Sequence, residues 1–497
     1  MMNTGDAILA DIREHPDDAA LRRIYADWLD DHGDAARAEF IRVQLDLAAL
    51  GEWDDARPAL EKRQAQLLRE HEQQWLTGLP RKGLEYRFAG GFAEEVSGSA
   101  FRVLGNLATI GRQVPVRRMT LRRDLPARDH RPVEALAVLD RIESLAFSNT
   151  GPSASDWSAL LEDCAFSRLR NLELILERDP ISILGRLAQH PIASRLACLS
   201  LHVGSDEFWT LAPLQAWPEA NPLRSFHLHA TNSTPESMLE SLGKLPLLAR
   251  LRELNLWLDL PTNSVLDALR SAPSVPHLQR LTIITLTNDD LVGQLLADLP
   301  LDSLRHLHLD ANVADGETLG RLCRTPWFER LETLELWSTP QFELDRFVHK
   351  GLPAPRLIRC VLSLPPDEPA IRTLAAWGTW PSVRSLGILG VCTGDQLRLF
   401  LDGAPLDNLR DLRVGRTFPE EVGDRIAKWP GLSHLWRLNV SSSGLTDIGA
   451  RALLNALPPL VELNLEGNRL SADTVAAFRD LEASGHIGTL YIDEAKS

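Results

Sequence analysis

The chain has 497 residues, of which 44% are hydrophobic and 24% are charged, and these proportions indicate a folded protein rather than a disordered one. The formal net charge of −15 argues against a dedicated nucleic-acid binder and against binding to an anionic membrane, because phosphates require a basic face. The N-terminus has no basic segment followed by an apolar core, and no apolar run approaches ~18 residues, so we expect neither a secretory signal nor a transmembrane helix.

Residues 1 to about 79 are predicted to form three or four helices. Asp17 and Asp18 follow a proline at a place where a helix N-terminus favours acidic residues, and Gly33 is a natural helix stop. The inward face of this helix is predicted to contain Ala20, Leu21, Ile24 and Leu29. A second helix is predicted from Ala35 to Leu50, and a third from Pro58 to Leu76. The inward residues of the second helix are predicted to be Phe40, Ile41, Val43 and Leu47.

An acidic cluster lies at the end of the first of these predicted helices. Its members are Asp27, Asp30, Asp31, His32 and Asp34. A metal site is one interpretation, but loops that bind calcium through oxygen atoms need ligands spaced to wrap one ion and a closing glutamate. We therefore interpret the cluster as a solvated helix end and turn.

The motif YADWLDDHGDxxRAEFIRVQ, followed by LLREHEQQWL, resembles the repeat-companion domain that begins many repeat proteins of planctomycetes and some other bacteria. This resemblance implies a context and no chemistry. Residues 1–78 contain 17 acidic and 9 basic residues, whereas seven arginines lie between Arg112 and Arg131. We expect the acidic segment to dock beside this basic region, because the open end of a repeat array exposes a hydrophobic core and a sheet edge.

The rest of the chain repeats the frame LxxLxL, with conservative apolar replacements, at intervals of 25 to 28 residues. A weaker first strand is predicted from Gly91 to Gly98. The frame begins at Val116, Ile142, Leu169, Leu196, Leu223, Leu251, Leu278, Leu304, Leu331, Leu357, Val383, Leu409, Leu435, Leu460 and Ile487. Each copy alternates apolar and polar residues, which predicts a short strand with one buried face. Helical stretches such as TDIGARALLNAL lie between the strands, and many end in a proline that stops the helix.

This frame resembles the leucine-rich repeat, and its length and helical segments are most similar to the ribonuclease-inhibitor-like subclass. The resemblance implies an α/β fold: a horseshoe solenoid, with a parallel sheet inside and helices outside, preceded by a small all-α domain. We expect residues 1–79 to form a capping domain and residues 80–497 to form about 15–16 repeats. The usual asparagine at the ninth frame position remains only at Asn312 and Asn468, and other repeats carry Ser443, Thr231, Asp259 or Pro365. The hydrogen-bond ladder must therefore be completed by other groups.

The third, fifth and seventh frame positions alternate with the buried ones and should point away from the core. Two of them are Trp257 and Trp337. Tryptophan is the residue type most enriched at interface hot spots, although each ring could instead lie across the aliphatic stems of its neighbours. Five histidines occupy such positions in five consecutive repeats: His202, His227, His229, His306 and His308.

Because neighbouring strands lie ~4.8 Å apart, His202 and His229 should be neighbours, and His227 lies two residues from His229. Three imidazoles could converge on one zinc ion, and these histidines are therefore candidate metal ligands. We favour a pH-sensitive hydrogen-bonding surface instead. His306 and His308 lie too far along the array to complete the same site.

Motifs for phosphoryl, acyl or hydride transfer and for zinc proteases do not occur, so we do not expect an enzyme or a cofactor. The five scattered cysteines are expected to be buried free thiols in a reducing cytoplasm. The prediction is a monomeric, non-catalytic scaffold that binds a partner protein, basic through electrostatic steering, on the concave face. The predicted binding residues are Trp257, Trp337, His202, His227, His229, Glu253, Asn255, His306, His308, Asp310 and Glu335.

Three alternatives to this prediction stay open. The first is a metal-dependent enzyme or metal-binding protein that uses His202, His227 and His229. The second is a structural role in which the N-terminal cap or the terminal strand, Gly488 to Glu494, pairs with another copy, although Asp493 and Glu494 resemble charged protection of that edge. The third is nucleic-acid binding through Arg118, Arg122 and Arg123, a patch that a docked acidic cap would occupy.

Overall fold

The computed structural model describes residues 4–123, 125, 133–149, 151–177, 179–204, 210–218, 221–230, 242, 245–258, 269–270, 275–285, 296–310, 321–337, 356–364, 367–389, 392–415 and 422–494. The chain packs into two compact units. The first comprises Met1–Gly51, Leu67–Asp259 and Asp267–Ser274, and the second comprises Glu52–Gln66, Leu260–Leu266 and Val275–Ser497.

Four helices precede the first strand, as the sequence predicts: α1 (Thr4–Glu14), α2 (Ala19–Asp31), α3 (Ala35–Ala49) and α4 (Arg57–Trp75). The Asp18 side chain caps α2 by accepting hydrogen bonds from the amides of Ala20 and Leu21. In α3 the four residues predicted to face inward are all buried. The prediction for α2 is wrong at Ala20, which is exposed, and at Ile24, which is 51% exposed, because α2 turns Arg22, Ala26 and Leu29 inward instead.

The acidic cluster after α2 makes the contacts of a helix end. Arg42 lies 2.7 Å from a carboxylate oxygen of Asp27 and 2.7 Å from one of Asp30. Asp34 caps α3 by accepting a hydrogen bond from the amide of Arg37. These carboxylates therefore neutralise an arginine and complete a helix terminus.

The strands of the first unit run from an antiparallel pair into a parallel series. Strand β1 pairs with β2 in antiparallel fashion, and each strand from β2 to β8 pairs in parallel with the next. Their bounds are β1 (Leu84–Ala89), β2 (Phe92–Ser99), β3 (Arg118–Arg122), β4 (Ser144–Ser148), β5 (Asn171–Leu176), β6 (Cys198–Val203), β7 (Ser225–Ala230) and β8 (Glu253–Leu258). Strand β2 confirms the strand predicted from Gly91 to Gly98.

Helices and short 3-10 turns connect these strands. The α-helices are α5 (Ala100–Gln113), α6 (Val133–Leu139), α7 (Ala154–Asp163) and α8 (Pro180–Gln189). The 3-10 turns are η2 (Pro191–Ser194), η3 (Ala212–Ala216) and η4 (Pro246–Arg250). Each of these 3-10 segments has a proline at its first or second residue, where the missing amide hydrogen costs nothing.

The second unit continues the same pattern. Its parallel strands are β9 (Arg280–Thr285), β10 (His306–Asp310), β11 (Thr333–Leu336), β12 (Arg359–Ser363), β13 (Ser385–Leu389), β14 (Asp411–Val414), β15 (Arg437–Asn439), β16 (Leu460–Asn464) and β17 (Ile487–Tyr491). Its helices and turns are η5 (Val275–His277), η6 (Phe328–Arg330), α14 (Glu368–Ala375), η7 (Trp380–Ser382), α15 (Gly394–Gly403), α16 (Val422–Lys428), η8 (Pro430–His434), α17 (Asp447–Ala456) and α18 (Ala472–Ala483). Residues 52–66, which include the first half of α4, belong to this unit.

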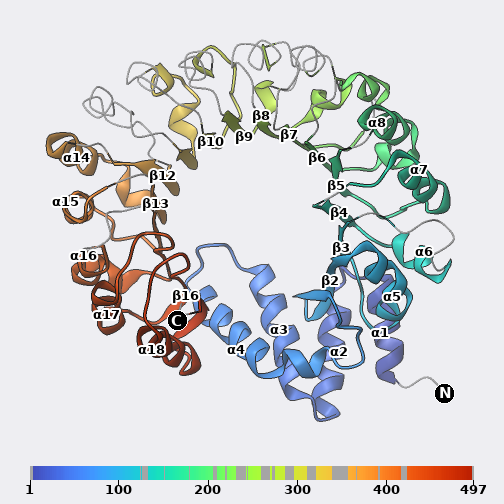
Figure 1. Ribbon diagram of the computed structural model, residues 1–497, viewed down its shortest axis with the longest axis horizontal. Coiled ribbons are helices and arrows are strands. Elements are labelled where there is room, and N and C mark those ends of the chain that lie inside the picture. The colour runs from blue at the N-terminus through green and yellow to red at the C-terminus, as the bar shows by residue number, and fades with distance from the viewer. Residues whose placement is uncertain are drawn as a thin grey trace. The chain divides into compact units, whose positions relative to one another are not determined.

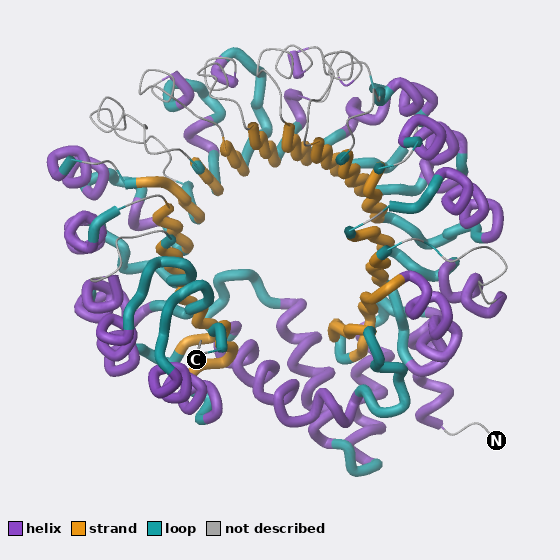
Figure 2. The backbone as a smooth tube through the Cα atoms, viewed as in Figure 1, coloured by secondary structure: helices purple, strands orange, loops and turns teal. Residues whose placement is uncertain are grey.

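In each unit the strands line one side, and the helices and turns that connect them line the other (Figures 1 and 2). The residues that begin the fifteen predicted frames are all buried, and they lie between these two layers. The architecture is therefore α/β with mostly parallel strands, consistent with a leucine-rich-repeat-like solenoid. We call the side of the strands that faces away from this core the open face.

The hydrogen-bond ladder at the ninth frame position uses asparagine where one is available. The side-chain amide of Asn468 donates to the carbonyls of Val440 and Leu465 and accepts from the amide of Leu445. In the preceding repeat the Ser443 hydroxyl donates to Val440 O at 2.7 Å, which confirms that another group replaces the asparagine. Asn312, Thr231, Asp259 and Pro365 lie outside the described residues.

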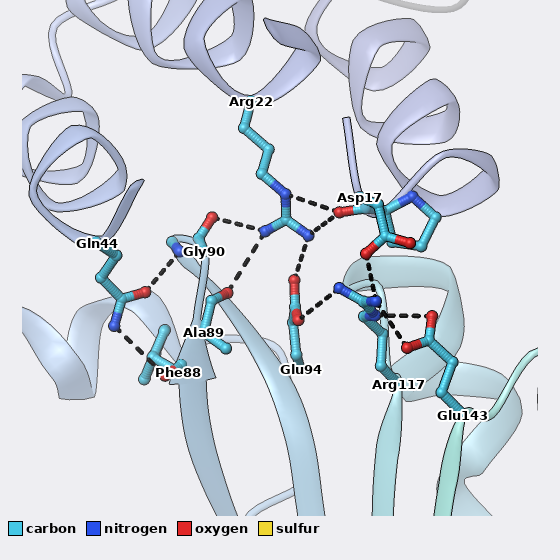
Figure 3. A network of polar contacts seen from close by, with 11 residues as sticks. Asp17, Arg22, Gln44, Phe88, Ala89, Gly90, Glu94, Arg117 and Glu143 are labelled. Carbon is cyan, nitrogen blue, oxygen red and sulfur yellow. Dashed lines mark hydrogen bonds and ion pairs between the residues drawn. The ribbon is translucent and has the colours of Figure 1, made fainter. Parts of the chain in front are cut away.

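The N-terminal helices dock on the first strands through a small core and a buried ion-pair network. The core residues are Ile12, Ala26, Leu29, Ala38, Ile41 and Phe92. Beside them the Arg22 guanidinium binds the Glu94 carboxylate and donates to the carbonyls of Pro16 and Gly90 (Figure 3). Both side chains are at most 5% exposed. At the centre of this contact, the N-terminal helices therefore supply the positive charge and β2 supplies the negative charge. This is the opposite of the prediction, in which an acidic cap docks on a basic repeat.

The periphery of this contact has the predicted charges. Arg117 lies 2.5 Å from Asp17 and 2.6 Å from Glu143, and Arg141 lies 2.7 Å from Glu14. Arg122 pairs with Glu85 of β1 at 2.7 Å, so this arginine of the basic region is engaged within the chain.

All five cysteines are free; four are buried and Cys198 is partly exposed. Burial raises the pKa of the thiol of Cys164 to about 11, so this thiol stays protonated at neutral pH. Among the helices described, none combines the length and the apolar character that a bilayer crossing requires.

Candidate functional site

The predicted binding residues of the first unit lie together on three adjacent strands, β6, β7 and β8. The strand register aligns the side chains in rows, because His202 pairs with His229 and His229 pairs with Trp257. A second row places His227 beside Asn255, and a third places Ser225 beside Glu253. Leu199, Leu201, Phe226, Leu228, Leu254 and Leu256 alternate with these residues and are buried, so the polar set occupies the open face.

The row at the seventh frame position forms a stack of rings. The indole of Trp257 lies flat on the His229 imidazole, with ring centroids 4.0 Å apart and an angle of 9° between the planes. His229 in turn meets His202, with 3.1 Å between the two Nδ1 atoms. Trp257 stays 38% exposed, so one face of a large ring is presented to solvent while the other is held in place.

Glu173 of β5 occupies the fifth frame position, in the row of Ser200, and its side chain approaches His202 of the seventh-position row. Its carboxylate lies 3.1 Å from His202 Nε2, which favours a proton on that nitrogen. His202 Nδ1 is then an acceptor, and the Nδ1–H of His229 donates to it. Burial lowers the pKa of His229, and the neighbouring His202 lowers it further. The His229 ring is therefore neutral at neutral pH, and its buried Nε2 has no hydrogen-bond partner among the described residues.

His227 does not join the other two imidazoles. Its Nε2 lies 2.8 Å from the Ser225 hydroxyl and 3.6 Å from Glu253. Within the part of the chain that the structure describes, no group of three or more histidine, cysteine, aspartate or glutamate side chains could hold a metal ion. The structure thus brings His202 and His229 together, but not the three candidate ligands.

The remaining predicted residues lie on β10 and at β11 in the second unit. His306 Nδ1 lies 2.9 Å from the Thr333 hydroxyl, and His308 Nδ1 lies 3.7 Å from Glu335. Burial lowers the pKa of His308, against the opposing effect of Glu335 and Asp310. Burial raises the pKa of Asp310. This cluster is thus partly withdrawn from water.

Trp337 differs from Trp257 in its surroundings. It follows β11 directly, its ring centroid lies 5.6 Å from that of His308, and the Arg413 guanidinium lies 5.7 Å from its centroid. Its indole N–H is buried and has no hydrogen-bond partner in the described structure. Trp337 therefore packs within its neighbours more than Trp257 does, although both occupy the same frame position.

A polar hollow of about 340 Å³ lies on the open face of β9 to β12. The register aligns Arg280, His306, Thr333 and Arg359 along one row. Thr282, His308 and Glu335 form the next row. The Glu52 side chain reaches the hollow from the N-terminal part of the chain and lies 2.7 Å from Arg359. The lining carries both charges and is accessible from solvent.

Sequence reasoning missed three residues of these surfaces. Glu173 occupies the fifth position of the frame that begins at Leu169, so the outward positions of that repeat identify it. Arg359 also occupies an outward frame position. Glu52 had no such signal, because it lies outside the repeats and 307 residues from Arg359.

Comparisons with known proteins concern the fold. The sequence matches no protein-family model and no curated protein. The crystal structure of the TLR13–ssRNA13 complex is similar over 74% of this chain, with 17% identity and a TM-score of 0.35, and this chain spans 51% of that one. The yeast Rad7–Elc1 structure is similar over 99% of this chain and 93% of that one, with 14% identity and a TM-score of 0.39. A Bacteroides fragilis protein is similar over 63% of this chain and 70% of that one, with 15% identity and a TM-score of 0.28.

Proposed function

We propose that the protein is a non-catalytic recognition scaffold that binds a partner protein on its open face. The observation that carries this proposal is the ring stack of β6 to β8. Trp257 is held flat against His229 and yet exposes a large apolar surface beside polar side chains. Such an arrangement loses little conformational entropy on binding, because the ring is already ordered before the partner arrives.

The chemistry around this stack supports a partner that presents basic or hydrogen-bond-donating groups. Glu173 lies beside His202, and Glu253 lies beside His227. The two carboxylates thus flank the aromatic platform, and the net charge of −15 would favour the approach of a basic protein. Tryptophan with a polar surround is a recurrent composition of interface hot spots.

We propose further that residues 1–79 cap the repeats and that residues 80–497 form a ribonuclease-inhibitor-like solenoid. The buried pair of Arg22 and Glu94 supports the capping role, because it closes the exposed end of the first strands with satisfied polar groups. Helix α17 follows β15 and helix α18 follows β16, and connecting helices of this kind support the ribonuclease-inhibitor-like subclass. The repeat-companion resemblance fits the same role.

A single substitution tests the proposed recognition surface. In affinity capture from native-host lysate, Trp257→Ala should lose the partner that the intact chain retains. With the partner purified, the dissociation constant should rise by roughly 30-fold or more, because truncation of a hot-spot residue costs about 2 kcal/mol or more.

Phe101→Ala is the matched control, because Phe101 is an aromatic residue on α5 that is 66% exposed and lies outside the open face. Both variants should keep the intact circular dichroism spectrum and melting temperature. Equal capture by the intact chain and by folded Trp257→Ala would refute the role of the ring stack.

A further inference from the structure

The open face of the last strands is already occupied by a segment of the same chain. Residues 52–66, which we call the strap, belong to the second unit. Figure 1 shows the beginning of α4 beside β16. The strap contacts three strands. It makes an ion pair with β12, an ion pair and a ring contact in and beside β15, and a hydrogen bond beside β17.

Two glutamates of the strap reach arginines of the third frame position. Glu52 lies 2.7 Å from Arg359 of β12, and Glu61 pairs with Arg437 of β15. Glu61 and Arg437 are 15% and 24% exposed, so their pair is shielded from water much more than an ordinary surface pair. The strap thus supplies the carboxylates that these outward arginines bind.

The strap also makes an aromatic contact through Trp53 and a hydrogen bond through Lys62. The Trp53 ring lies 6.3 Å from the Trp436 ring, centroid to centroid. The Trp436 ring also lies under the guanidinium of Arg410, at 5.7 Å. Lys62 Nζ donates to His486 O at 3.3 Å, just before β17. Burial lowers the pKa of Lys62, which agrees with a lysine drawn against the strands.

The same contacts also bring several carboxylates close together, which opposes the docking of the strap. In the strand register Arg437 lies between Asp411 and Glu462, so Glu61 is the third carboxylate around one guanidinium. Burial raises the pKa of Asp411 and of Glu462. Glu52 adds to the first increase and Glu61 adds to the second. Bringing the strap onto the strands therefore has an electrostatic cost, which Arg57 of the strap, 2.8 Å from Glu61, partly offsets.

We propose that the strap is a resident ligand of the open face of β12 to β17, and that a partner bound there is an acidic, aromatic protein segment that displaces it. This inference rests on the proposed recognition function and names the partner chemistry for a second surface. An acidic partner at this surface differs from the basic partner expected from the net charge, because Arg359, Arg437 and Trp436 determine the local chemistry here. Being part of the chain, the strap competes with an effective concentration of roughly millimolar order.

A peptide added in trans tests this proposal without any unidentified partner. The probe is the synthetic peptide LGEWDDARPALEKRQAQ, residues 50–66, carrying a fluorophore for anisotropy. The full-length Glu52→Arg/Glu61→Arg variant should release the strap and leave the strand arginines intact. It should bind the peptide at least 10-fold more tightly than the wild type does. Asp55→Arg/Glu70→Arg, which makes the same charge change at two exposed residues, should behave as the wild type.

Adding Arg359→Ala and Arg437→Ala to the released variant should abolish peptide binding, because alanine removes the cations without recreating an ion pair to the strap. Hydrogen exchange of residues 52–66 should be faster in the released variant than in the wild type. If charge reversal unfolds the chain, Glu52→Gln/Glu61→Gln provides the same comparison. Equal binding to wild-type and released chains, binding that survives loss of both arginines, or preference for a peptide with lysines at its acidic positions would overturn the proposal. The Trp257 experiment uses other residues, so either result can fail while the other holds.

Discussion

At the scale of single residues, the Arg22 and Glu94 pair is the contact on which the docking of the N-terminal helices depends most. The Arg22 guanidinium donates to three backbone carbonyls, those of Pro16, Ala89 and Gly90, as well as to Glu94. Its removal takes the donor from these buried carbonyls and leaves the buried Glu94 carboxylate only the more distant Arg117, at 3.7 Å. We expect Arg22→Gln to lower the free energy of unfolding by about 3–5 kcal/mol, the usual cost of breaking a buried pair on one side. Urea denaturation followed by circular dichroism measures this change.

The adjacent Arg23 provides the control at the same scale. Its ion pair with Asp46 is about half exposed on both sides, and exposed pairs contribute only about 0.2–1 kcal/mol because water and salt screen them. Arg23→Gln should therefore leave the urea midpoint almost unchanged. Comparable losses in the two variants would mean that the Arg22 network is not specifically stabilising.

At the scale of elements, the tight turn between β1 and β2 determines how closely α3 can approach the strands. Gly91 has a φ of +91°, and a Cβ atom there would lie 2.3 Å from Ile41 Cγ1 of α3. Gln44 of α3 also accepts a hydrogen bond from the Gly91 amide at 2.6 Å. Gly91→Ala should lower the free energy of unfolding by about 2–4 kcal/mol, because left-handed strain adds to overpacking. Thermal denaturation would detect it.

Gly105 is the matching glycine in an element without such constraints. It lies within α5, and a Cβ atom there would meet nothing within 4 Å. Gly105→Ala should stabilise the chain by about 0.5–1 kcal/mol, because alanine favours the helix more than glycine does. Opposite signs for the two substitutions are the expected result, and a stabilising Gly91→Ala would contradict the close packing of α3.

At the scale of the whole molecule, repeats contact mainly their neighbours, so damage should stay local. Leu307 of β10 is completely buried, and Leu307→Ala should cost about 2–5 kcal/mol. Hydrogen exchange should become faster in β9 to β11 and remain unchanged in β3 to β5. The reciprocal variant, Leu145→Ala in β4, should show the reverse pattern. Uniformly faster exchange in both variants would instead indicate one cooperative unit.

The sequence alone predicted the repeat, the buried face of each strand that follows the LxxLxL frame and the outward positions of the candidate surfaces, but not strand β1 (Leu84–Ala89). These properties are local, because the period of two in LxxLxL states which side of each strand meets the core. The same period predicted that His202, His229 and Trp257 would lie in one row. Helix starts were equally local, as Asp18 and Asp34 show by capping α2 and α3.

Which side chains meet across long separations in the chain becomes clear only in the folded protein. Glu61 and Arg437 are 376 residues apart, and in the pair of Arg22 and Glu94 the positive charge comes from the acidic N-terminal segment. Ile24 was predicted inward, but Arg22 occupies that side of α2 because its charge finds partners there. His227 points away from the other histidines because the Ser225 hydroxyl offers it a hydrogen bond and the Glu253 carboxylate lies 3.6 Å away. Such choices depend on the competition among all neighbours in space, which no local pattern records.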